Sequence, residues 1–548
     1  MTAIETDTES HGDETMTAAA SGDALYEIIA SNDHKMVGRR FIFASLLMLV
    51  GVAVVGLLSE LERASLDGFG VLGNVATYIQ TFAFVRAGGV LLVAMPLFIG
   101  IALVTVPLQI GAQAVAFPRL AAASFWTWLV GSGIFIASFI ADGGFGPAAG
   151  TANDATLLTI TSTGMVIASL LAACVCIATT VIALRPAGMT LMRVPMFSWS
   201  MLVASSVWLL SLPVLMGNLV LIFADLQGRA PIAFGDPDTI WSQVEWAFQA
   251  PQILAFAIPV LGVAADIIPV AAKVRQGQRA VVQTLIGVFG AVSFGAWAQH
   301  AFSRGIDPAF TSGNLIYEEA LYALFAIAAL AVAFAAFGGI LDNLRRGTMP
   351  KLSMATVGAI AGLFLLLDAA AVGFVRVMPF LDALHEDQVL LSSTGSQYKF
   401  VLAAIVASAI GAIGWWSPNI FGGYAVEGLG LLAVLAALGF GVLGGLADLI
   451  TAFLGQADIS IASNVDDGVE ALNVISSIGM LAVAVAGLAL LGSAMGAFRS
   501  TETLPDDPWD GHTLEWAAPS PPPIGNFVEP VGVIESPEPL LDQLEEVS

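Results

Sequence analysis

Residues Trp241–Leu254 read WSQVEWAFQAPQIL and lie inside a long apolar run of the chain. The stretch combines three large aromatic residues, Trp241, Trp246 and Phe248, with Pro251. The rest of the chain has the same character, because 57% of its 548 residues are hydrophobic and its mean hydropathy is +0.85. An ordinary soluble domain has a lower apolar fraction that is interrupted more often.

Apolar runs of about 18 residues or more predict membrane-spanning helices. We count twelve such runs, centred near residues 50, 94, 131, 170, 210, 258, 291, 328, 365, 406, 440 and 484. The sequence therefore predicts an all-α integral membrane protein in contact with membrane lipid, with a twelve-helix membrane domain over residues 38–499.

The net charge of −24 is concentrated at the two ends of the chain. Residues 1–37 and 500–548 hold 19 of the 43 acidic residues and a single basic residue, Lys35. Such acidic tails are usually solvated and disordered, so we expect no nucleic-acid partner. The C-terminal tail is also rich in proline, which is typical of an extended linker or of a docking strand.

Lysine and arginine predict how the spans are oriented. If residues 1–37 are placed in the cytoplasm, thirteen Lys and Arg residues fall on the cytoplasmic side and five on the other, among them Arg63 and Lys399. This bias follows the positive-inside rule. It predicts a multi-pass protein whose two tails, 1–37 and 500–548, are both cytoplasmic.

Several long motifs resemble subunit I of the haem-copper (cytochrome c) oxidases. They occur in the family's order, and the resemblance extends over about residues 30–530: PLQIGAQAVAFPRL at 107–120, MTLMRVPMFSW at 189–199, WSPNIFG at 416–422 and DPWDGHTLEW at 507–516. The WSQVEWAFQAPQIL stretch resembles the family's sixth membrane helix. The resemblance implies the twelve-helix bundle of that subunit, and a place among other oxidase-type or respiratory subunits in a bacterial plasma membrane.

The same resemblance implies that the metal ligands of the family are missing. Its haem-binding histidines align with Val85, Ser396 and Tyr398. Its copper-binding histidines align with Ala250, Gln299 and His300, of which His300 alone is a histidine. Independently of the register, two haems and a copper need six imidazoles in this family, and the chain has five histidines. We therefore expect no cofactor, and a lone His300 is more typical of a hydrogen-bonded interior residue.

The family's proton-conducting side chains are missing as well. The aligned positions hold Ala114, Gln252, Ala329 and Val332, none of which exchanges protons at neutral pH. Acidic and basic residues are costly inside a membrane and are kept there when they carry ions or protons. The sequence thus predicts that both proton channels have been lost.

Two charged residues in apolar runs depart from the family pattern, Arg86 and Glu245. They form a candidate polar site, either as a new ion path or as an ion pair centred on Arg86, whose long stem could fill space vacated by haem. The alternative is that such charges lie near helix ends or are satisfied between helices, which we favour for Asp266 and Asp448.

Three functions remain open from the sequence. The first is a catalytically inactive subunit I-like protein that acts as a structural or assembly partner in a respiratory or related membrane complex. The second is a carrier of ions, protons or a lipophilic molecule that uses the vacated haem cavity. The third, disfavoured by the histidine count, is an active oxidase with divergent ligands.

Overall fold

The computed structural model describes residues 30–65, 70–145, 153–229, 240–299, 315–376, 388–460 and 468–547. Within these described ranges, twelve helical spans are long and apolar enough to cross a membrane, at the positions that the sequence predicts. In chain order they are α2 (His34–Arg63), α3–η1–α4 (Val75–Gly88, Gly89–Ala94, Met95–Gln109), α5 (Pro118–Ile140), α6 (Asn153–Ala183), α7 (Met196–Leu226), α9–α10 (Gln252–Ala255, Ile258–Ala271), α11–η5 (Arg279–Val292, Ala296–Ala298), α13 (Leu315–Arg346), α14 (Met354–Arg376), α16 (Gln388–Phe421), α17–η6–α18 (Glu427–Gly439, Phe440–Leu446, Ala447–Phe453) and α19 (Val469–Phe498).

Short elements connect the spans. Between spans lie η3 (Leu191–Arg193), α8 (Ile240–Val244) and η4 (Glu245–Phe248), whereas η8 (Leu514–Trp516) and α20 (Pro539–Val547) follow the last span. The first span begins at His34, four residues before the expected boundary at 38, because Asp33 caps the helix by accepting a hydrogen bond from the Lys35 amide. Asn74 caps α3 in the same way, through the amide of Thr77.

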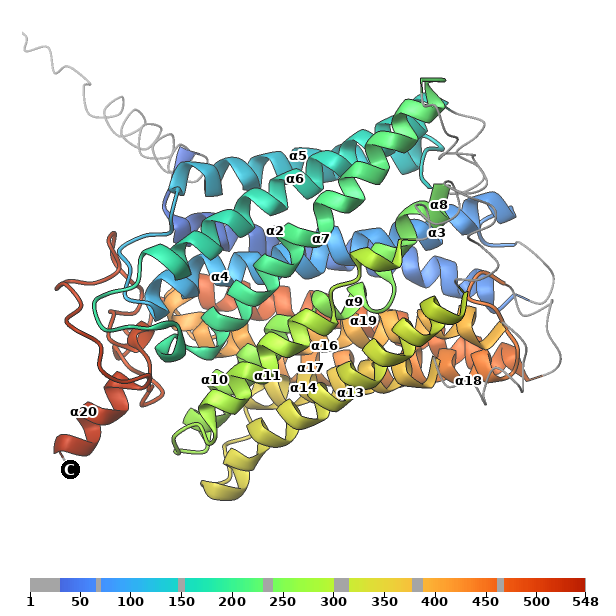
Figure 1. Cartoon of the computed structure of the whole chain (residues 1–548). Helices are drawn as coiled ribbons and strands as arrows, with labels where there is room; N and C mark the ends of the chain where they lie inside the picture. The colour runs from blue at the N-terminus through green and yellow to red at the C-terminus, as the bar shows by residue number, and fades with distance from the viewer. Residues whose placement is uncertain are drawn as a thin grey trace, which may run out of the picture.

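The spans differ in how much of their surface reaches the outside of the bundle. The spans α3–η1–α4, α9–α10 and α16 are buried on all sides, whereas α13 is the most exposed. In Figure 1 the bundle lies on its side, with α5, α6 and α7 along one edge and α13 and α14 along the other. A helix that is apolar all round and surrounded by other helices forms the core of a membrane bundle.

Small residues allow the central helices to approach closely. Where α14 packs along α16, a Cβ atom added to Gly358 would lie 2.7 Å from the Ala407 carbonyl oxygen and from the Gly411 nitrogen. Membrane helices pack through van der Waals contact rather than through the hydrophobic effect, so small residues favour such crossings. The α14–α16 contact fixes α16, which supplies several residues of the candidate site.

The C-terminal segment 500–547 folds back over one end of the bundle, which we call the tail face (Figure 1). The Trp509 indole stacks on Trp415 of α16, with ring centroids 5.1 Å apart, and its Nε1 donates to the Trp415 carbonyl at 3.0 Å. Asn526 donates to the Ala112 carbonyl at 2.7 Å, and the Ile534 amide donates to the Ala187 carbonyl at 2.9 Å. Residues 500–547 are thus docked on the bundle, and the expectation of a disordered C-terminal tail is wrong for them.

Candidate functional site

The positions aligned with the haem ligands lie at the centre of the bundle. Val85 on α3 and Tyr398 on α16 are both buried, and the Tyr398 hydroxyl donates to the Val85 carbonyl at 2.6 Å. Next to them, the π-helical turn η1 begins at Gly89, where an added Cβ would lie 1.8 Å from the Tyr398 hydroxyl. Ser396 donates to the Gly445 carbonyl of η6 at 2.7 Å. The hydroxyl groups of Tyr398 and Ser396 are thus both hydrogen-bonded to backbone carbonyls of neighbouring helices.

The positions aligned with the copper ligands fall in the turn before α9 and after η5. Ala250 and Gln299 are half-buried, and His300 lies outside the described residues. Gln252, at the start of α9, donates from Nε2 to Ser211 Oγ at 2.9 Å and accepts from the Gly295 amide at 2.9 Å. Its amide therefore ties α7 and the Gly295 loop together with neutral hydrogen bonds.

The other positions that the resemblance aligns with proton-conducting side chains lie on two elements, the turn after α4 and helix α13. Ala114 is half-buried in the turn after α4, Ala329 is buried in α13 and Val332 is half-buried there. None carries a polar side-chain atom, so these positions supply no group that could bind a proton.

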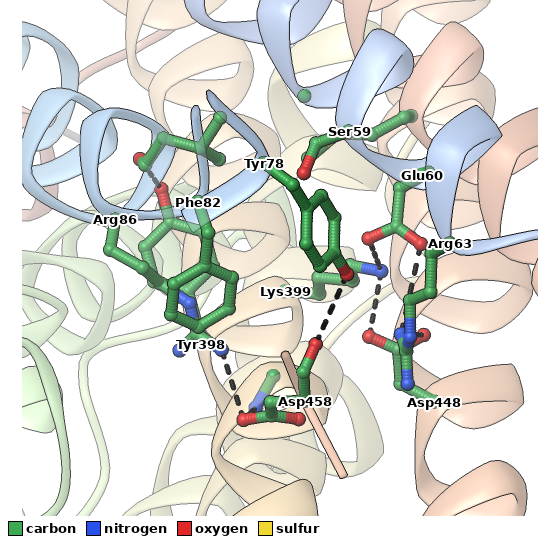
Figure 2. A pocket seen from close by; sticks show the side chains of 14 residues that line it. Ser59, Glu60, Arg63, Tyr78, Phe82, Arg86, Tyr398, Lys399, Asp448 and Asp458 are labelled. Carbon is green, nitrogen blue, oxygen red and sulfur yellow. Dashed lines mark hydrogen bonds and ion pairs between the residues drawn. The ribbon is translucent and has the colours of Figure 1, made fainter. Parts of the chain in front are cut away.

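The structure brings together a set of charges that the sequence did not connect. We call Glu60, Arg63, Arg86, Lys399, Asp448 and Asp458 the charge cluster (Figure 2). All six are buried, and they come from α2, α3, α16, α18 and the loop after α18. Three cations face three anions, so the cluster is neutral as a whole when each group is ionised.

Lys399 is the centre of one half of the charge cluster. Its ammonium lies 2.5 Å from Glu60 Oε1 and 2.7 Å from Asp448 Oδ2, and it donates to Ser476 Oγ at 2.6 Å. Asp448 also accepts from Arg63 at 2.8 Å. All three hydrogens of the ammonium therefore have acceptors, the condition under which a buried charge is tolerated.

Arg86 and Asp458 form the other half of the charge cluster. The Arg86 guanidinium lies 3.3 Å from Asp458 Oδ2 and donates to the Thr394 carbonyl at 3.0 Å. It sits between two aromatic rings, 4.7 Å from the centroid of Phe82 and 4.8 Å from that of Tyr398. Burial raises the pKa of Asp458, and the guanidinium of Arg86 counteracts part of that effect. Arg86 is thus the centre of an ion pair, one of the two roles open from the sequence.

Glu245 and Arg86, the two candidates from the sequence, line one cavity of about 200 Å³. The cavity is also lined by Asp458 and by the rings of Phe82, Trp241 and Phe248, of which Trp241 and Phe248 stack with centroids 6.1 Å apart. Burial raises the pKa of Glu245, while the guanidinium groups of Arg376 and Arg86 lower it. The structure therefore places both residues on one polar, aromatic-walled site.

Sequence reasoning missed most of the charge cluster. Arg63 and Lys399 were counted among loop charges on the side opposite the tails, but both are buried, 3% and 4% exposed. Asp448 was expected to be satisfied between helices, and the structure confirms this through Arg63 and Lys399. A signal was available in Glu60 and Arg63, which are one helical turn apart at the end of an apolar span.

The comparisons with known proteins agree with this architecture. The sequence model of the family described as Cytochrome C and Quinol oxidase polypeptide I matches residues 36–504. This chain belongs to that family. It is 27% identical to cytochrome c oxidase subunit 1 of Bacillus subtilis strain 168, covering 92% of this chain and 81% of the relative. It is 28% identical to the cytochrome c oxidase subunit 1 of Corynebacterium diphtheriae, and the match covers 96% of this chain and 94% of the relative.

A solved structure supports the fold of the family independently of sequence. A heme-copper terminal oxidase dimer determined by cryo-electron microscopy matches with a TM-score of 0.64 at 11% identity, covering 94% of this chain and 89% of that one. The twelve-helix bundle of the cytochrome c oxidase polypeptide I family is therefore the fold of this protein.

The residues at the family's haem position do not fit a haem. An iron held between two axial ligands requires those groups to stand apart, with the porphyrin between them. Here Tyr398 and the Val85 carbonyl are 2.6 Å apart, and the Val85 side chain has no donor atom for a metal. The cavity lined by Gly89, Tyr398 and Leu402 is about 10 Å³, scarcely the space of one water.

Proposed function

We propose that this protein is a catalytically inactive, subunit I-like member of the family that acts as a structural or assembly partner in a respiratory or related membrane complex. The observation that carries the proposal is the hydrogen bond of 2.6 Å from Tyr398 to the Val85 carbonyl, between two positions that the resemblance aligns with haem-binding histidines. A hydrogen bond at this position holds α3 and α16 together without an iron.

Two further observations support the loss of catalysis. Gln252 makes neutral hydrogen bonds to Ser211 and to the Gly295 amide, where the family has a proton-relaying glutamate according to the resemblance. Ala114, Ala329 and Val332 cannot carry protons through either channel. A protein that neither holds the metals nor conducts protons retains the surface of the subunit, and this surface is what a partner would recognise.

We further propose that the protein resides in a bacterial plasma membrane with both tails in the cytoplasm. The twelve apolar spans and the family make it an integral membrane protein. The excess of Lys and Arg at the tail face supports the orientation. The partners would then be other membrane subunits of an oxidase-type or respiratory complex.

A spectrum tests the main proposal most directly. The full chain is purified in mild detergent, and its reduced-minus-oxidised spectrum and metal content are recorded beside those of a catalytic family member. We expect no Soret band, no stoichiometric iron or copper, and co-purification of oxidase-type subunits. Stoichiometric haem would instead mean an active oxidase with divergent ligands, and a solitary protein would contradict the assembly role.

A second candidate function is transport of an ion, a proton or a lipophilic molecule. It is favoured by the cavity of about 200 Å³ that Arg86 and Glu245 line together. Purified protein in proteoliposomes would then show uptake that Glu245→Gln abolishes and that the exposed substitution Glu502→Gln leaves unchanged. If wild-type vesicles take up no more than empty ones, this function is excluded.

A further inference from the structure

The docked C-terminal segment encloses a groove at the tail face. The groove has a volume of about 830 Å³ and runs between residues 527–536 and helix α20. Its apolar lining includes Leu514, Phe527, Val531 and Ile534. Ile534 is 6% exposed and its amide is bonded to Ala187, so the inner wall of the groove is fixed to the bundle.

Large apolar side chains beside the groove are exposed outside the membrane-spanning segments. Val528 is 78% exposed and Val533 67%, both in the groove lining, and the nearby Ile524 is 93% exposed. Exposed apolar residues on the spans face lipid, but these lie in a segment beyond the last span, which ends at Phe498. Apolar residues gathered at a rim of polar groups in water mark an interaction surface.

The rim of the groove is acidic and lacks its own counter-charge. Asp506, Glu529 and Glu535 line the groove and form no ion pair with any described residue, whereas Asp542 and Glu538 are paired with Arg275. Residues 500–548 contain neither Lys nor Arg. Asp506, Glu529 and Glu535 therefore have no cationic partner among the described residues and can pair with basic groups of another polypeptide.

The charge also selects among possible occupants. Residues 1–29 of this chain carry seven acidic residues and neither Lys nor Arg, so they would be repelled by the rim. An anionic membrane surface would be repelled for the same reason. A basic segment with apolar side chains satisfies both the acidic rim and the exposed valines.

We propose that this groove docks a basic, apolar polypeptide segment of a partner membrane subunit on the tail face. The proposal rests on the assembly role proposed above and states the chemistry of the partner. Val528 and Val533 would contribute apolar contact, and Glu529 and Glu535 would pair with Lys or Arg of the partner and set the orientation of the segment.

The test uses the full chain in nanodiscs of zwitterionic lipid and two fluorescent peptides. In one peptide arginines alternate with leucines, and in the other glutamates replace the arginines; empty nanodiscs correct for binding to lipid. We expect the arginine peptide alone to bind, with affinity reduced roughly tenfold by Val528→Ser/Val533→Ser. The charge reversal Glu529→Lys/Glu535→Lys should exchange the preference to the glutamate peptide.

A matched control is available at the same end of the bundle. Met349 and Leu352 are 84% and 80% exposed between α13 and α14, outside the groove, so Met349→Ser/Leu352→Ser should leave binding unchanged. Equal binding of both peptides, or binding that survives the charge reversal, would refute the proposal. Competition for the groove by a peptide of residues 1–29 would also refute it. So would a dimer of this chain, detected by native mass spectrometry, if Val528→Ser/Val533→Ser dissociates that dimer.

The groove and the assembly role can fail separately. Loss of peptide binding with oxidase-type subunits still co-purifying would reject the groove and keep the assembly role. If the protein purifies without oxidase-type subunits but still binds the arginine peptide through the groove, the assembly role is rejected and the groove is kept.

Discussion

At the scale of single residues, Lys399 joins two carboxylates of the charge cluster. Its ammonium is the shared partner of Glu60 and Asp448, both deep in the protein. Removing one partner of a buried ion pair leaves an uncompensated charge and costs about 3–5 kcal/mol. Lys399→Met should therefore lower the melting temperature of the detergent-solubilised protein clearly.

The matched control for this substitution is Lys273→Met. The Lys273 side chain is 72% exposed and its contact with Asp510 is 4.0 Å, so its loss should change stability by less than about 1 kcal/mol. Equal melting temperatures for Lys399→Met and the wild type would mean that the charge cluster contributes nothing to the fold.

Glu515 gives the attachment of the C-terminal segment a pH dependence. Gln109 donates from one amide nitrogen to Asp266 at 2.8 Å and to Glu515 at 3.1 Å, which places two carboxyl groups side by side. Burial, and then the charge of Asp266, raise the pKa of Glu515 from 4.5 to about 7. Because the folded-state pKa lies above the unfolded value, the docked state is most stable below pH 4.5 and loses stability as the pH rises towards 7.

Hydrogen exchange of residues 511–518 measures this effect. In the wild type, exchange corrected for the intrinsic rate should increase between pH 5 and pH 8, and in Glu515→Gln it should stay level across that range. A pH dependence that persists in Glu515→Gln would assign it to another group.

At the scale of elements, the π-helical turn η1 is shaped by its contact with α16. The first residue of η1 is Gly89, and the Tyr398 hydroxyl occupies the place of a side chain there. Gly89→Ala should lower the free energy of unfolding by about 1–3 kcal/mol, because the added methyl group overpacks this contact. In a Tyr398→Phe background the cost should be smaller, because the nearest remaining ring atom is 3.0 Å away.

Thermal unfolding of the two single variants and the double variant measures this coupling. Gly133→Ala on α5 is the control, since an added Cβ there has no atom within 4 Å, and alanine favours a helix. Additive effects of Gly89→Ala and Tyr398→Phe would show that the two residues do not share this space.

The elements also show how far the sequence could predict the structure. Hydropathy located all twelve spans, because each is a long apolar run. Counting from fixed motifs selected Val85 and Tyr398, which the structure places in contact. Hydropathy could not show that Lys399 meets Glu60, 339 residues away, because each side chain resembles a charge at a helix end when taken alone. The π-helical turns also escape a search for ordinary helical periodicity.

At the scale of the whole molecule, the C-terminal segment ties together spans that are distant in sequence. Asn526 contacts both His34 and Lys35 of α2, and Asp542 pairs with Arg275 beyond α10. Deletion of residues 501–548 should therefore increase hydrogen exchange at the ends of the spans on the tail face, while the charge cluster keeps its protection. Equal loss of protection at both ends of the bundle would mean that the segment stabilises the entire bundle.

The charge cluster also constrains the order of biosynthesis. A nascent chain inserts α2 with Glu60 and Arg63 long before the ribosome reaches Lys399, and Asp448 comes later still. A charged group costs about 2.5–3.5 kcal/mol at the centre of an inserting helix on translocon scales, and less at the end of the helix, where Glu60 and Arg63 lie. On α2 the Arg63 Nη1 and Glu60 Oε2 atoms lie 3.7 Å apart, so the two charges can neutralise each other until Lys399 and Asp448 are synthesised. The first membrane helix thus reaches its final partners only after the tenth and eleventh have entered the bilayer, so this part of the protein assembles late in translation.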